Sequence, residues 1–103
     1  MDFTDNGIII LEKGIKKKIK CKKFYCKPIE RFLMVHEDVD NKNLTNVSDF
    51  ITGYRLFSLN TKCSQIKSEQ IKERLAQFIK HFTTDGIAKE FKRVEKLLET
   101  ERK

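Results

Sequence analysis

The residues of this sequence with the clearest chemical potential are basic, and they are concentrated near its start. Residues 13–31 hold eight lysines and Arg31 against the single acid Glu30, a local net charge of +8, while the whole chain carries +7. The twelve residues before them are acidic, and residues 32–103 are nearly balanced. A concentrated patch of this sign attracts polyanions such as phosphate backbones, anionic membrane surfaces or acidic protein faces.

Alternation within the basic stretch predicts how the lysines are presented. From Ile15 onward one set of alternate positions is mostly apolar, and the other is wholly cationic: Lys16, Lys18, Lys20 and Lys22. This period of two predicts a strand whose lysine face is ~20 Å long at about 3.3 Å per residue. A helix would place Lys22 and Lys23 where apolar residues are needed. We therefore expect a strand with one cationic face.

A lysine face of this kind suits non-catalytic nucleic-acid binding. Ammonium groups in a line neutralise phosphates and release counterions, which gives a salt-sensitive affinity with little sequence preference. Phe24 and Tyr25 are candidates to stack on unpaired bases, and Arg55 is a candidate further cation. The plainer interpretation is a solvated strand whose lysines prevent edge-to-edge pairing. The predicted interface comprises Lys16, Lys18, Lys20, Lys22, Lys23, Tyr25 and Arg31.

The alternative function is that of a protein–protein interaction module, a small regulator or inhibitor that docks on a larger partner. The same lysines would contact an acidic protein surface, or an apolar strip near the C-terminus would form the contact. That strip is also the candidate seam of a homodimer, and it consists of Val94, Leu97 and Leu98.

Acidic and histidine side chains form a second cluster, at His36, Glu37, Asp38 and Asp40. Acids at the end of a strand can hold Mg²⁺ for phosphodiester chemistry. A two-metal nuclease, however, needs carboxylates that converge from separate elements, whereas these are sequential. Residues 38–43 also lack the glycine that a calcium loop needs at its sharp turn. We expect a solvated acidic loop without catalytic activity.

The three cysteines, Cys21, Cys26 and Cys63, form a poor zinc pattern. No second Cys/His pair accompanies the C-x4-C spacing, and a strand through both positions would direct Cys21 and Cys26 to opposite faces. No local signature supports a Cys–His nucleophile or a glycine-rich phosphate loop. We predict no metal, no cofactor and no enzyme. The odd number of cysteines and the lack of a signal-peptide pattern predict reduced thiols in the cytoplasm, and no apolar run is long enough to span a membrane.

Strand signals predominate in residues 1–60. A β-branched run at 7–11, a loop containing Gly14 and a strand from Ile15 predict a hairpin. Phe32–Val35 predicts a short central strand that is buried on both faces.

Residues 44–59 fit either a second hairpin around Thr52-Gly53 or a helix. A glycine in mid-helix costs about 1 kcal/mol relative to alanine. The segment is also rich in threonine, aromatic and β-branched residues, which favour strands. We favour the hairpin.

Residues 64–99 predict two amphipathic helices. The first begins at a Ser68 N-cap, and its apolar stripe consists of Ile71, Leu75, Phe78, Ile79 and Phe82. The second follows a break at 83–86 with a stripe of Ile87, Phe91, Val94 and Leu98. The expected fold is α+β in one domain, residues 1–103: an antiparallel sheet of four to five strands with two C-terminal helices packed on one face.

Overall fold

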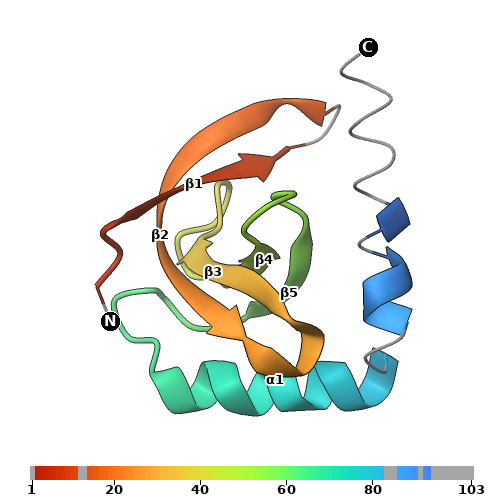
Figure 1. Cartoon of the computed structure of the whole chain (residues 1–103). Helices are drawn as coiled ribbons and strands as arrows, with labels where there is room; N and C mark the ends of the chain where they lie inside the picture. The colour runs from red at the N-terminus through yellow and green to blue at the C-terminus, as the bar shows by residue number, and fades with distance from the viewer. Residues whose placement is uncertain (1, 12–13, 83–85, 91, 94–103) are drawn as a thin grey trace.

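The chain folds into five antiparallel strands that are adjacent in chain order, followed by a helix (Figure 1). The computed structural model describes residues 2–11, 14–82, 86–90 and 92–93. A 3-10 turn, η2 (Lys27–Ile29), joins the second and third strands. The elements are β1 (Asp5–Ile10), β2 (Lys16–Cys26), β3 (Arg31–Glu37), β4 (Thr45–Asp49), β5 (Arg55–Leu59) and α1 (Ser68–Phe82). The predicted α+β fold with an antiparallel sheet is confirmed.

Strand β2 belongs to two layers of the molecule. Residues 16–21 pair with β1, and residues 22–26 pair with β3. The strand curves strongly between these halves, so that β1 passes over the sheet formed by β3–β5 (Figure 1). At its far end the Ile10 N–H donates to the Gly53 carbonyl oxygen in the β4–β5 turn at 3.4 Å. The sheet is therefore curled and partly closed on itself.

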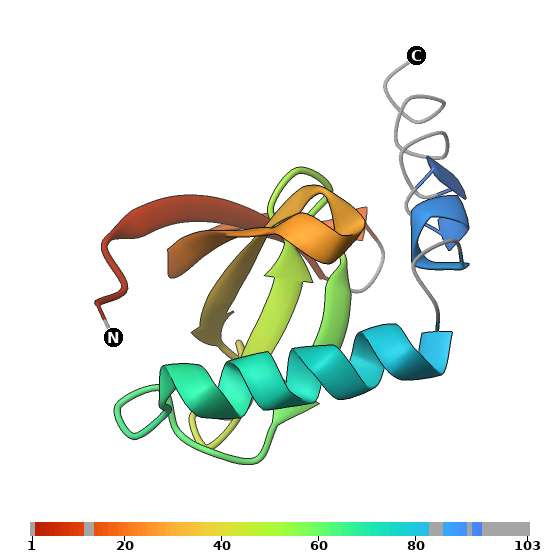
Figure 2. The ribbon, with the colours of Figure 1, turned by 60° about the horizontal axis from the view of Figure 1, so that its bottom comes forward.

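Two apolar clusters hold these layers together. The main core lies between α1 and the sheet, and its buried members include Leu33, Val35, Val47, Phe57, Ile71 and Leu75. The smaller second core joins β1 and β2 to the opposite face of β3 through Ile9, Cys21 and Met34. Figure 2 shows α1 along one side of the sheet and β1 on the other. Strand β3 is thus central and buried on both faces, as its apolar run predicted.

The predicted second hairpin is also confirmed, with different boundaries. Strand β4 ends at Asp49, so Phe50 and Ile51 lie in the turn, and Tyr54 precedes β5. The turn starts early because the Asp49 carboxylate accepts hydrogen bonds from the Thr52 N–H at 2.8 Å and the Thr52 hydroxyl at 2.7 Å. Similarly, His36 and Glu37 are part of β3 and not of the acidic loop to which the sequence assigned them.

Helix α1 starts at Ser68, so Ser68 is its first helical residue and not the N-cap that the sequence predicted. The capping contact belongs to Lys67, whose N–H donates to the Gln70 side-chain oxygen at 2.9 Å. Of its expected apolar stripe, Ile71 and Leu75 are buried against the sheet, whereas Phe82 is 52% exposed. Residues 86–90 and 92–93 are helical. The rest of the predicted second helix, including Val94, Leu97 and Leu98, lies outside the described residues, so the packing of two helices remains a prediction. No helix in the described part of the chain is both long and apolar enough to cross a membrane.

Candidate functional site

The predicted cationic face exists, and we call it the lysine ridge: Lys16, Lys18, Lys20 and Lys22. All four side chains are exposed on one face of β2. They point outward because the alternate residues Ile19 and Cys21 pack into the second core. Strand β2 is strongly curved in Figure 1, so the four ridge lysines do not lie along a straight line.

The residues of β1 that pair with the lysine ridge carry no negative charge. Its register partners on β1 are Ile10, Ile8 and Asn6, none of them an acid. Lys20 Nζ donates to Asn6 Oδ1 at 2.7 Å, which orients one ammonium group without neutralising it. Among the residues that the structure describes, no ion pair includes a ridge lysine. No ion pair between described residues thus neutralises a ridge lysine, although Lys20 lines a shallow pocket together with Glu37 and Asp38.

Lys23 projects from the opposite face of β2, among aromatic rings. Its Nζ lies 4.5 Å from the centroid of the Phe32 ring and 4.3 Å from that of Phe50. Tyr25, the register partner of Phe32, completes the group, with ring centroids 5.0 Å apart. Tyr25 is 53% exposed and Phe32 is 42% exposed. We call Lys23, Tyr25, Phe32 and Phe50 the aromatic patch.

The structure places the two rings predicted to stack on bases, Phe24 and Tyr25, on opposite faces of β2. Tyr25 is exposed, but Phe24 lies on the other face of the strand and packs against the main core. Phe24 is therefore corrected from a candidate contact to a core residue. Phe32 and Phe50 were missed because they are distant from Tyr25 in sequence. Only the pairing of β2 with β3 brings Phe32 beside it.

Arg31 is already engaged within the protein. Its Nε and Nη2 donate to the two carboxylate oxygens of Asp49 at 2.7 and 2.8 Å, and the Asp49 side chain is fully buried. A bidentate pair of this kind fixes both side chains. Arg31 thus joins the start of β3 to the end of β4, and this role explains its presence without any external phosphate.

His36 is buried, with 2% of its surface exposed, and not solvated as the sequence suggested. Its Nδ1–H donates to the Glu37 carbonyl oxygen at 3.1 Å, which leaves Nε2 to accept from the Ser48 hydroxyl at 2.7 Å. Burial lowers the pKa of His36 below its ordinary value of 6.5. The neutral ring is therefore held in one orientation inside the sheet.

Asp38 continues this polar network. Asn46 Nδ2 donates to Asp38 Oδ1 at 2.8 Å, and Asn46 Oδ1 in turn accepts from the Ser58 hydroxyl at 2.7 Å. The hydrogen bond from Asn46 lowers the pKa of the Asp38 carboxyl. Arg55 Nη1 is 4.0 Å from the same carboxylate and is largely exposed. Glu37 and Asp40 are exposed and join the network through their backbones, since the Asp40 N–H donates to Asp38 Oδ2 at 3.1 Å.

These polar groups line a cleft of about 460 Å³ together with Ile9, Ile10 and Leu11. A neutral imidazole beside a hydroxyl is the pairing that activates a serine nucleophile. Ser48 is only 1% exposed, however, and its hydroxyl is bonded within the sheet, so a substrate carbonyl could not reach it. Sequence reasoning missed Asn46 and Ser48, although polar residues at alternate positions of a buried strand are a readable signal. We assign the network to the positioning of β3, β4 and the loop after β3.

The cysteines lie in separate environments. Cys21 belongs to the second core and Cys26 to the main core, on opposite faces of β2 as expected. Burial raises the pKa of both thiols, which disfavours the reactive thiolate. Among the described residues, no group of three or more histidine, cysteine or acidic side chains is placed to hold a metal ion.

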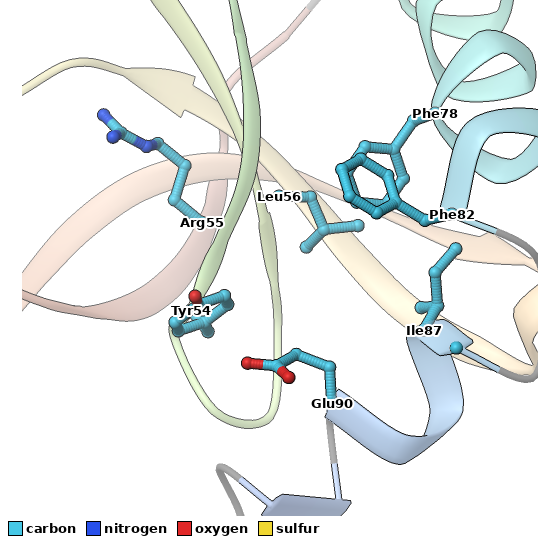
Figure 3. A pocket seen from close by; sticks show the side chains of 8 residues that line it. Tyr54, Arg55, Leu56, Phe78, Phe82, Ile87 and Glu90 are labelled. Carbon is cyan, nitrogen blue, oxygen red and sulfur yellow. The ribbon is translucent and has the colours of Figure 1, made fainter.

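An apolar groove opens between β5, α1 and residues 86–90 (Figure 3). It has a volume of about 350 Å³, and Leu56, Phe78, Phe82 and Ile87 line it. Tyr54 and Glu90 stand at its rim in Figure 3. This groove was not predicted from the sequence, because it forms only where α1 and the following helical residues meet the sheet.

The chain matches no known protein family, no curated protein and no solved structure.

Proposed function

We propose that this protein binds nucleic acid without catalysis, through contacts between the lysine ridge and the phosphate backbone. The observation that carries the proposal is a row of four exposed lysines on one face of β2, with no acid among its partners on β1. Lysine charge positions a phosphate backbone but reads no bases, so we expect binding with little sequence preference. The reduced thiols and the basic balance of the chain fit a cytoplasmic setting.

The proposal makes a quantitative statement about salt. Four neutralised phosphates give a slope of log affinity against log salt of about −3.6 on duplex DNA and about −2.8 on a single strand. Arg31 is left out of the interface because Asp49 occupies its guanidinium. Lys23 and Tyr25 lie on the other face of β2, so they do not add to the slope on a duplex.

A charge-matched comparison tests the lysine ridge. In one variant Lys16, Lys18, Lys20 and Lys22 become glutamine; in the control the same change is made at four exposed lysines elsewhere, Lys62, Lys67, Lys72 and Lys80. Fluorescence anisotropy with a labelled duplex should show weak binding and a nearly flat salt dependence for the ridge variant. The control should retain most of the slope.

Two results would contradict the proposal. One is the absence of wild-type binding at low ionic strength. The other is an equal loss in the two variants, because that would reduce the effect to net charge. Both variants change exposed side chains and should keep their unfolding free energies within about 0.5 kcal/mol of wild type, which separates a loss of binding from a loss of folding.

A second candidate function, a protein–protein interaction module, is favoured by the apolar groove. Phe82 is 52% exposed and Tyr54 is 43% exposed beside it, and large exposed apolar groups that cluster often mark a contact surface. This function ranks second, because nothing in the groove selects one partner. A homodimer through Val94, Leu97 and Leu98 belongs to the same hypothesis. Sedimentation equilibrium on wild type and a Phe82→Glu variant tests for self-association through the groove.

A further inference from the structure

We infer that the aromatic patch is a platform for unpaired bases, so that the ligand of highest affinity is a flexible single-stranded nucleic acid. This inference rests on the proposed function, and it adds the class of nucleic acid. Tyr25 and Phe32 present exposed rings beside each other, with centroids 5.0 Å apart. An exposed ring next to a basic surface stacks on any base, because every base has a π-face.

Lys23 gives the aromatic patch its preference for an anionic ligand. Its ammonium group lies over both Phe32 and Phe50, and such cation–π contacts fix a positive charge among the rings. One acid contacts this residue: Asp5 Oδ2 accepts the backbone N–H of Lys23 at 2.9 Å, whereas the ammonium group lies over the rings. A base that stacks on Tyr25 would therefore bring its phosphate towards a positioned cation.

The lysine ridge and the aromatic patch meet at one point along β2. Lys22 is the last member of the ridge and Lys23 the first of the patch, and both are exposed although they leave opposite faces of the strand. Pairing with β1 ends at Cys21, and beyond it the Asp5 carboxylate accepts the backbone N–H of Lys23 at this edge. A ligand that touches both surfaces must pass over this edge beside that carboxylate.

The geometry of that passage selects the ligand. To touch both surfaces, a ligand must bend around the edge of β2. The bend must be completed within the length of a few residues. Duplex DNA has a persistence length of about 150 base pairs and resists such a turn. A single strand bends freely and has unpaired bases to offer. We therefore expect a duplex to contact the lysine ridge alone and a single strand to contact both surfaces.

Intrinsic fluorescence tests the contact at Tyr25 directly. The chain has no tryptophan and two tyrosines, so in a Tyr54→Phe variant Tyr25 is the only tyrosine emitter. Titration with oligo(dT) should quench its emission, whereas a duplex of equal phosphate concentration should not. Absence of quenching by saturating oligo(dT), with binding confirmed by anisotropy, would overturn the inference and leave the lysine ridge untouched.

Affinities supply the second test. Tyr25→Leu and Phe32→Leu should each weaken binding to oligo(dT) by about 5- to 150-fold, the range found when one base loses its aromatic partner. Their duplex affinities should stay within about twofold of wild type. Tyr25→Phe retains the ring and should bind oligo(dT) nearly as wild type, and Tyr54→Leu controls for the loss of an exposed tyrosine elsewhere.

The outcomes of the two proposals are distinguishable. If the patch variants weaken binding to duplex and single strand equally, or weaken binding to neither ligand, the inferred platform is wrong. The proposed role of the lysine ridge is not affected by that result. If the ridge variant binds both ligands like wild type, the proposed function is wrong and the inference falls with it. Circular dichroism on each variant identifies any that fail to fold, and Phe32→Leu serves where Tyr25→Leu is lost.

Discussion

The two faces of the sheet differ in how much apolar surface covers them. The face under α1 is covered by a continuous apolar layer that includes Leu33, Val47 and Leu75. The opposite face has a small apolar centre around Met34, with polar groups at His36 on one side and the aromatic patch on the other. The first face is organised for stability, since burial of apolar surface is the main favourable contribution to folding. The second leaves Lys23 and the rings of Tyr25 and Phe32 exposed, whereas the lysine ridge leaves the other face of β2.

The largest loss of stability is expected from a substitution on the face of the sheet under α1. Asp49 is fully buried, and Asp49→Ala would leave the Arg31 guanidinium without its bidentate partner and remove the acceptor for Thr52. Breaking one partner of a buried pair costs about 3–5 kcal/mol. Urea denaturation should show a loss of this size. Asp40→Ala, at an exposed acid, is the control, and an equal and small effect of both changes would refute the structural role of the pair.

A smaller loss of stability is expected from a substitution where β1 contacts the β4–β5 turn. Gly53 and Gly14 both have a φ of +76°, but a Cβ on Gly53 would lie 2.6 Å from the Ile8 carbonyl oxygen, whereas one on Gly14 meets nothing within 4 Å. Gly14→Ala should therefore show only the conformational cost, of about 1 kcal/mol. Gly53→Ala should be clearly more destabilising, because backbone atoms of β1 must also move. Equal melting temperatures for the two variants would contradict the close approach of β1 to the turn.

The smallest effect concerns the polar side of the uncovered face, and it depends on pH. His36 has a lowered pKa, so the unfolded chain binds a proton below its ordinary value of 6.5 more readily than the folded chain does. The stability due to the neutral ring is present above pH 6.5 and is lost as the pH falls below it, by at most about 1.4 kcal/mol per pH unit.

Unfolding free energies measured from pH 7.5 to 5 test this expectation. His36→Gln should flatten the pH dependence in this range, while His81→Gln, at an exposed histidine, should leave it unchanged. A wild-type stability that is constant over the range would refute the burial of a neutral imidazole.

The strands and the lysine ridge were predictable because each depends on a local pattern. The alternation around Lys18 and the apolar run at Phe32–Val35 each involve only a few neighbouring residues. The aromatic patch and the polar network were not predictable, because their members come from different strands. Phe32 meets Tyr25 only through the register of β2 and β3, and His36 meets Ser48 only through that of β3 and β4.

The pairing of Arg31 with Asp49 was also not predictable from the sequence, which indicated Arg31 only as a phosphate contact. A guanidinium in a basic stretch resembles its lysine neighbours in composition, and only the fold reveals a buried carboxylate beside it. Burial of this kind is a property of the assembled sheet, which explains why charge counting could not detect it.

Because β2 pairs with β1 in one half and with β3 in the other, it links the unfolding of the two parts of the sheet. Eleven consecutive residues run without interruption from the hairpin with β1 to the main core beneath α1. Neither layer can melt without disturbing the strand on which the other depends. Thermal unfolding should therefore be a single cooperative transition, and the β2 amides that bond to β1 and those that bond to β3 should become exposed to solvent exchange together.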